Sequence, residues 1–102
     1  MPYVRHTMMT FDPSDYDSIM SIADNTREAI MGWSGLISVR AVRVADDRMI
    51  VTGAYIDKAA ADANAENARS NFGKMGEFMT APPVQREGEV IWGYDADDQS
   101  KE

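Results

Sequence analysis

The sequence contains no cysteine and a single histidine, His6. The absence of cysteine excludes disulfide bonds, thiolate nucleophiles and thiolate metal ligands. One histidine without cysteine supplies a transition-metal site poorly, because such sites draw most of their ligands from these two residue types. We therefore expect no metal ion in the functional site.

Basic residues are also few, since ten lysines and arginines stand against 17 acidic residues and the net charge is −7. A chain of this charge repels phosphate backbones, so nucleic acid is not an expected partner. Apolar runs are short, and none approaches the roughly 20 residues that a membrane-spanning helix needs. The N-terminal segment is too short and polar to serve as the apolar region of a signal peptide. We expect a cytoplasmic protein that has no membrane partner.

The composition that remains is that of an ordinary globular domain, because 44% of the 102 residues are hydrophobic and 26% are charged. A chain of this length builds one hydrophobic core. Residues 1–94 are predicted to form that domain. Residues 95–102 hold four acidic residues and no large apolar one, which predicts a flexible, solvated tail.

The first half of the chain predicts a strand, a helix and a hairpin. Residues 3–11 are rich in β-branched and aromatic types and end at Asp12-Pro13. Asp12 can cap a helix whose first position is Pro13, and apolar residues at spacings of three and four continue this helix to Gly32. Residues 36–44 and 49–56 are predicted strands, joined by an acidic turn at 45–47.

The second half predicts a helix and a strand. Asp57 can cap the helix, and Pro82-Pro83 end it. The apolar stripe of this helix alternates spacings of four and three and consists of Ala61, Ala65, Ala68, Phe72, Met75 and Met79. After a turn at Glu87-Gly88, residues 89–94 are predicted to form the last strand.

The order β-α-β-β-α-β predicts an α+β, ferredoxin-like fold, in which a four-stranded antiparallel sheet carries both helices on one face. Every predicted strand has an apolar or aromatic residue on each side. The second face of the sheet would therefore expose more apolar surface than a monomer usually does. We expect a homodimer that packs sheet against sheet.

Three segments resemble the dimeric α/β-barrel proteins that include the antibiotic biosynthesis monooxygenases: residues 32–36, residues 54–61, and Pro82-Pro83 followed by residues 87–90. The resemblance spans residues 3–94 and concerns the fold, since none of these segments is a catalytic motif. It implies a barrel shared by two subunits, each with a pocket between its sheet and helices. Such pockets are often used for cofactor-independent oxidation of aromatic molecules.

The residues of the first strand and the second helix do not match the haem-degrading branch of this family. The haem-degrading branch uses an asparagine on the first strand and a tryptophan and a histidine on the second helix. Here the first strand offers Arg5 and His6, and the second helix contains neither tryptophan nor histidine. Haem degradation by that route is therefore not expected.

His6 is the candidate catalytic residue, because its unperturbed pKa lies near neutrality. As a general base it could remove a phenolic or enolic proton from a bound substrate. Strand alternation gives it the same face as Val4, Met8 and Thr10. The favoured alternative is a histidine that is hydrogen-bonded at a sheet or dimer surface, since a single unpartnered histidine is weak evidence for catalysis.

Five further residues are candidates for substrate binding. Asn64, Asn67 and Asn71 lie along one stripe of the second helix, where their amides could orient a polar ligand. The resemblance points the same way, since the polyketide-oxidising branch has asparagine and tryptophan at its site. Trp33 and Trp92 offer flat surfaces for an aromatic ligand. Contacts to a neighbouring loop and ordinary packing explain these five residues as well.

Two functions remain open. The first is cofactor-independent oxidation of a small aromatic or quinol-type molecule, for which the pocket must contain His6 or the asparagines beside an aromatic wall. The alternative is a non-catalytic dimeric protein of the same fold that binds a small ligand or acts in stress. A bound ligand that is oxidised in air supports the first, and a bound ligand that stays unchanged supports the second.

Overall fold

The computed structural model describes residues 1–96, apart from the side chain of Phe72. Its strands are β1 (Tyr3–Thr10), β2 (Leu36–Ala45), β3 (Arg48–Tyr55) and β4 (Val84–Glu89). Its α-helices are α1 (Tyr16–Asn25), α2 (Arg27–Met31), α3 (Lys58–Ala63) and α4 (Ala65–Gly73), and its 3-10 helices are η1 (Pro13–Asp15) and η2 (Gly76–Phe78). Most of the predicted acidic tail, residues 97–102, lies outside the described part of the chain.

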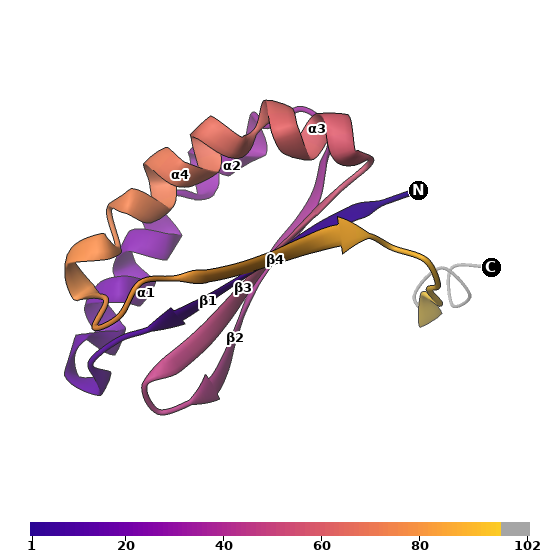
Figure 1. Cartoon of the computed structure of the whole chain (residues 1–102). Coiled ribbons are helices and arrows are strands. Elements are labelled where there is room, and N and C mark those ends of the chain that lie inside the picture. The colour runs from indigo at the N-terminus through magenta and orange to yellow at the C-terminus, as the bar shows by residue number, and fades with distance from the viewer. Residues whose placement is uncertain (97–102) are drawn as a thin grey trace.

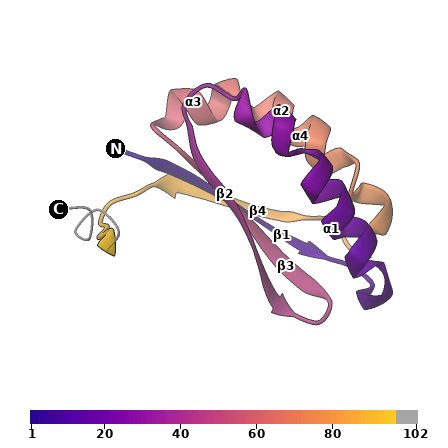
Figure 2. The same cartoon turned by 180° about the vertical axis from the view of Figure 1, so that it is seen from behind.

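The four strands form one antiparallel sheet in the order β2-β3-β1-β4. The helices all lie on one face of this sheet, and no helix or strand of residues 1–96 covers the other face (Figures 1 and 2). The predicted α+β, ferredoxin-like βαββαβ fold is confirmed. No helix within residues 1–96 is long and apolar enough to cross a membrane.

Strand β1 lies inside the sheet and separates the two faces by alternation. Tyr3, Arg5, Thr7 and Met9 are buried beneath the helices, whereas His6 is exposed on the opposite face. Two polar residues, Arg5 and Thr7, thus stand in a row of otherwise apolar inward positions. They mark where the core of the domain is interrupted.

The first helical segment begins as predicted, because the Asp12 carboxylate accepts a hydrogen bond from the Ser14 backbone N–H at 2.9 Å. The predicted single helix is divided at Thr26, whose hydroxyl donates to the Ala23 carbonyl at 2.7 Å. Such a side-chain bond to the backbone competes with the helical pattern. The segment still ends at Gly32, as predicted.

The second helical segment is shorter than predicted. Asp57 does cap it, since its carboxylate accepts from the Ala60 N–H at 2.8 Å. The helix is divided at Asn64 and ends at Gly73, and only the 3-10 turn η2 follows before the prolines. The prediction of a continuous helix to Pro82 was therefore wrong, because Gly73 and Gly76 are poor helix formers that weaken the apolar period.

The predicted last strand was also wrong. Residues 89–94 were expected to pair, but β4 is Val84–Glu89, and Glu87 and Gly88 lie inside it and not in a turn. β4 is an edge strand whose residues are all exposed, so its sequence lacks the apolar run that predicts a central strand. Trp92 consequently follows the sheet and is 81% exposed.

The apolar core consists of two separate clusters. One contains the buried residues Met9, Phe11, Ile19, Met49, Val51 and Met75. The other contains Tyr3, Tyr55 and Ala61. Arg5 and Thr7 lie between these clusters along β1, and a cavity opens above them.

Candidate functional site

A cavity of about 500 Å³ lies between strands β1 and β4 and helix α4. This volume is within the range of sites that bind small molecules. The cavity is lined by Arg5, Thr7, Met9, Asp62, Ala65, Ala68, Arg69, Gly73, Gly76, Met79, Pro83, Gln85 and Glu87. The helical side consists mostly of alanine and glycine, so small residues facing the strands leave the space unfilled.

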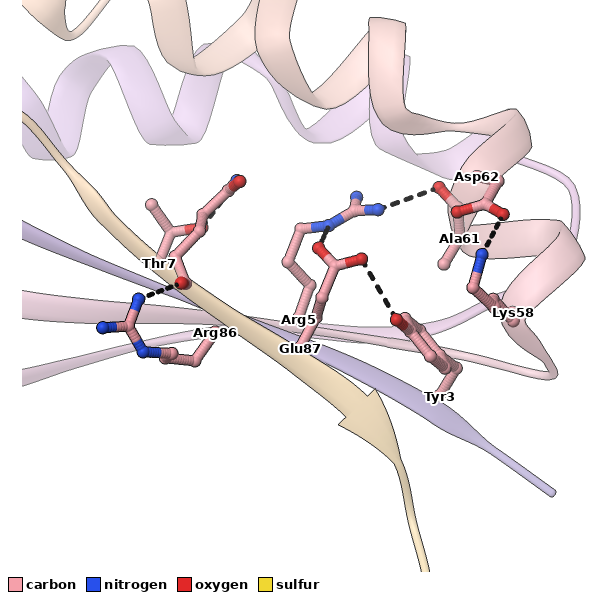
Figure 3. A network of polar contacts seen from close by, with 9 residues as sticks. Tyr3, Arg5, Thr7, Lys58, Ala61, Asp62, Arg86 and Glu87 are labelled. Carbon is pink, nitrogen blue, oxygen red and sulfur yellow. Dashed lines mark hydrogen bonds and ion pairs between the residues drawn. The ribbon is translucent and has the colours of Figure 1, made fainter.

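Arg5 forms the centre of the cavity floor. Its register partner on β4 is Glu87, and directly paired residues of antiparallel strands point to the same face. The Arg5 Nε lies 2.9 Å from the Glu87 Oε2, and its Nη2 donates to the Ala61 carbonyl at 3.2 Å (Figure 3). The guanidinium also lies 5.7 Å from the ring centre of Tyr55. Arg5 is 8% exposed, and these contacts compensate for its burial.

Glu87 is the acidic partner in this cluster. Its second oxygen accepts a hydrogen bond from the Tyr3 hydroxyl at 3.1 Å (Figure 3). The hydrogen bond from Arg5 lowers the pKa of Glu87 below its usual value, and the bond from Tyr3 acts in the same direction. The carboxylate is therefore ionised at neutral pH. An ionised carboxylate has about four acceptor positions, so two remain for a ligand.

Thr7 and Gln85 continue the polar floor without adding charge. They face each other across β1 and β4, and the Gln85 amide donates to the Thr7 hydroxyl at 3.3 Å. Beyond them the lining becomes apolar, with Met9 and Met79. The cavity thus has a polar floor on the strands, apolar residues beyond it, and the charged Asp62 and Arg69 on its helical side.

The charged side chains that line the cavity balance one another. Arg5 and Arg69 are basic, and Asp62 and Glu87 are acidic. The Asp62 Oδ2 lies 2.7 Å from the Lys58 Nζ, and the Glu66 Oε1 lies 2.7 Å from the Arg69 Nη1. Both ion pairs are on the exposed helical side. No group of three or more potential metal-ligating side chains occurs within residues 1–96.

His6 does not line this cavity. It lies on the opposite face of the sheet, where its Nδ1 is 2.9 Å from the Thr52 hydroxyl and the ring is exposed. Within one chain, the sheet separates His6 from Arg5 and Glu87. The contact with Thr52 corresponds to the alternative weighed from the sequence, a histidine hydrogen-bonded at the sheet surface.

The three asparagines also lie outside the cavity lining. Asn64 is 4% exposed, and its Nδ2 donates to the carbonyls of Ser34 and Ala60, each at 2.9 Å. Asn67 is exposed and donates to the Asn64 Oδ1 at 3.3 Å. Asn71 is half-buried. The amide of Asn64 therefore attaches the junction of α3 and α4 to the loop before β2.

The two tryptophans lie in different surroundings, and neither lines the large cavity. Trp33 is half-buried and lines a much smaller hollow of about 10 Å³ that also reaches Arg5 and Thr7. Trp92 lies beyond β4 and lines neither cavity. The structure therefore brings none of the sequence-predicted site residues into the large cavity.

Sequence reasoning missed the residues that do form the cavity floor. A signal for two of them was present, because Arg5 and Thr7 alternate with His6 and share the inward face with Tyr3 and Met9. A charged residue on the apolar face of a strand is uncommon and indicates a paired or functional site. Glu87 could not be found in this way, because its segment was predicted to be a turn.

No protein-family model matches this sequence, and no match is found among curated protein sequences. Solved structures, in contrast, are similar in fold. A protein of unknown function from Nitrosomonas europaea superposes with a TM-score of 0.76 at 14% identity, covering 91% of this chain and 92% of that chain. A second protein from Nitrosomonas europaea, provisionally assigned as an antibiotic biosynthesis monooxygenase, gives a TM-score of 0.75 at 17% identity, covering 89% and 91%.

A third similar structure is that of a variant of SnoaB from Streptomyces nogalater. It is a cofactor-independent oxygenase and superposes with a TM-score of 0.71 at 10% identity, covering 90% of this chain and 95% of that chain. Identities this low show the fold alone. The chain has the ferredoxin-like fold of the antibiotic biosynthesis monooxygenase-like proteins, as the sequence predicted.

Proposed function

We propose that this chain is a homodimeric, cofactor-independent oxidase of a small phenol- or hydroquinone-type molecule that binds in the large cavity. The observation that carries the proposal is the Arg5–Glu87 pair on the floor of a cavity of about 500 Å³. The fold shared with the cofactor-independent oxygenase SnoaB supports the same class of reaction. Fold alone does not establish it, so the argument rests on the cavity.

The cavity favours an uncharged ring with a hydroxyl or carbonyl group. Its four charged side chains sum to zero, so neither an anion nor a cation gains a net attraction. The apolar part of the lining suits the ring. Arg5 has five N–H donors and uses one for Glu87 and one for Ala61, which leaves donors for a ligand oxygen.

Deprotonation is the step that the floor would assist. A phenol becomes much easier to oxidise as its phenolate, and Arg5 is placed to stabilise the negative oxygen. Glu87, ionised on the same side, would take up the hydroxyl proton and pass it on to the reduced O₂. Arg5 is 8% exposed, so water screens its interaction with the ligand oxygen only weakly.

The oxidation of a hydroquinone balances with O₂ as the only other reactant. Two electrons pass from the ring to O₂, and the two hydroxyl protons leave with them. The products are one quinone and one hydrogen peroxide. The protein's contribution is to bind the ring, to hold the phenolate beside Arg5 and to limit the access of water.

The homodimer is supported by the open face of the sheet. Val42 and Val84 are 53% and 40% exposed there, in one register row with Ile50 and Met8. Covering this face requires roughly the 800 Å² per partner that a standard specific interface buries. The cytoplasmic location and the domain boundary at residue 94 stay predictions from the sequence.

The proposal is tested by a screen of electron-rich phenols and hydroquinones in air, without added metal or flavin, read by oxygen uptake and peroxide formation. If a substrate is found, Glu87→Gln and Arg5→Lys should each lower the rate by about 10²-fold or more, the lower end of what a positioned base or an oxyanion-stabilising donor contributes. Unchanged rates in both folded variants would remove the cavity floor from the mechanism.

His6→Ala belongs in the same assay, because His6 remains the candidate base proposed from the sequence. We expect this variant to keep its activity, since the side chain is on the face opposite the cavity. A loss of about 10²-fold or more in a folded, dimeric variant would instead support His6 as the base and a substrate site on the open face.

The alternative, a non-catalytic dimeric binding protein of the same fold, is favoured by one observation. Arg5 lowers the pKa of Glu87, which makes its carboxylate a weak base. A ligand that binds with unchanged absorbance and no oxygen uptake, and whose binding is weakened by Arg5→Lys, would support this alternative over the oxidase.

A further inference from the structure

The open face of the sheet carries two adjacent rows of side chains. Across β2, β3, β1 and β4, the register aligns an apolar row of Val42, Ile50, Met8 and Val84. The next row is polar and consists of Arg40, Thr52, His6 and Arg86. We call it the basic row because of its two arginines. Figure 3 shows Arg86 on the side of the strands away from the helices.

The segment that follows β4 is the most exposed apolar part of the described chain. We call residues 91–96 the C-terminal arm. Ile91, Trp92 and Tyr94 are 88%, 81% and 66% exposed. The arm leaves the end of β4 and turns away from the helices, toward the side of the open face (Figures 1 and 2). Large apolar side chains gathered on one exposed segment indicate an interaction site.

The charges of the arm and the open face are complementary. Asp95 lies in the arm, and the sequence continues with Asp97 and Asp98. The open face has Arg40 and Arg86 in a protein whose net charge is −7. In a sheet-to-sheet dimer, two-fold symmetry brings the basic rows of both copies near each other, so acidic groups between them would remove a repulsion.

The length of the arm also fits the width of the sheet. Residues 91–95 in extended form span about 13 Å from the first to the last Cα, four steps of roughly 3.3 Å each. Four strands about 4.8 Å apart measure about 14 Å between the outer two. The described arm thus spans nearly the full width of the sheet.

We infer that the C-terminal arm of one copy lies across the open sheet face of a second copy. Trp92 and its apolar neighbours pack on the apolar row, and Asp95 faces the basic row. This inference rests on the homodimer proposed above and adds the segment that holds it together. It also gives Trp92 a role in assembly rather than in ligand binding.

Sedimentation equilibrium of Trp92→Ala tests the apolar contact. We expect the dimer dissociation constant to rise at least about tenfold, the effect of truncating a tryptophan hot spot. Met31→Ala is the matched control, because Met31 is an equally exposed apolar residue (84%) on α2. It should leave the dissociation constant unchanged.

A charge-reversal cycle tests the orientation of the arm. Arg40→Glu and Asp95→Lys should each weaken the dimer, and the double variant should recover part of the loss. Arg27→Glu, an exposed arginine on α2, is the control and should have no effect. High salt should weaken the wild-type dimer if the arm pairs with the basic row, and should strengthen it if the rows only repel.

The outcomes separate this inference from the proposal on which it rests. A wild-type dimer that is unaffected by Trp92→Ala overturns the arm and leaves the dimer intact. A dimer that strengthens in high salt, with no recovery in the double variant, overturns the charge pairing. A wild-type chain that stays monomeric at all concentrations overturns the homodimer and the arm together.

Discussion

At the scale of single residues, the Arg5–Glu87 pair predicts how the stability of the protein depends on pH. The pKa of Glu87 is lower in the folded state than its usual value of 4.5, because Arg5 and Tyr3 donate hydrogen bonds to its carboxylate. Its contribution to stability is therefore fully present above that value and is lost as the pH falls through the folded pKa. We expect Glu87→Gln to be less stable than the wild type by about 1 kcal/mol at neutral pH, because a charged hydrogen bond to Arg5 and one to Tyr3 become neutral.

Urea unfolding at neutral pH and near pH 3 measures this difference. The gap between Glu87→Gln and the wild type should shrink at the acidic pH, because the carboxyl of the unfolded wild type takes up a proton there. Glu66→Gln is the control, since its pair with Arg69 is exposed and contributes little. The wild type will keep some acid sensitivity from Asp12, whose pKa is lowered by its hydrogen bonds to Ser14. A gap that stays constant between the two pH values would contradict the interpretation of Glu87.

At the scale of elements, the sequence predicted those that have a strong local signal. Strand β1 and the β2–β3 hairpin have β-branched or aromatic residues, and both long helical segments begin at an aspartate cap that the structure confirms. The errors lie where tertiary context decides. β4 is polar and pairs only because β1 offers its edge, and no local pattern predicts that.

The loop between α2 and β2 contains a glycine that packs closely against α3. Gly35 has a φ of +80°, and a Cβ there would lie 2.6 Å from the Cβ of Ala60 on α3. Gly35→Ala should therefore destabilise the protein by about 1–3 kcal/mol, through both backbone strain and overpacking. Thermal unfolding measures the change.

A second glycine provides the control for this prediction. Gly73 has no positive φ, and a Cβ there would meet no atom within 4 Å. Gly73→Ala should leave stability unchanged or raise it by about 0.4–1 kcal/mol, because alanine restricts the unfolded chain. Equal melting temperatures for the two variants would mean that the approach of Gly35 to α3 does not constrain the fold.

At the scale of the whole molecule, the order of elements was enough to predict the fold but not the site. Arg5 and Glu87 are separated by 82 positions in the sequence, and only the pairing of β1 with β4 brings them together. His6 and the asparagines were chosen for their chemistry, and the sheet and α4 turn them away from the cavity. A prediction of the site would have required the register of the edge strand.

The cavity lies between the two clusters of the core, and filling it should affect ligand binding more than stability. The cavity exists because small residues of α4 stand above Arg5 and Thr7, where a larger side chain would join the two clusters. Ala65 lines the cavity and is half-buried, so Ala65→Leu should fill part of the space. We expect stability to stay the same or to rise by about 0.5–2 kcal/mol, the usual effect of filling a cavity, while binding of a phenolic ligand is lost. Ala59→Leu, on the exposed side of α3, should change neither property.

Calorimetric titration of a phenol found in the screen measures ligand binding, and thermal unfolding measures stability. A variant that binds the ligand as well as the wild type would show that the ligand lies elsewhere, whereas a variant that loses binding and keeps its stability would locate the ligand between β1 and α4.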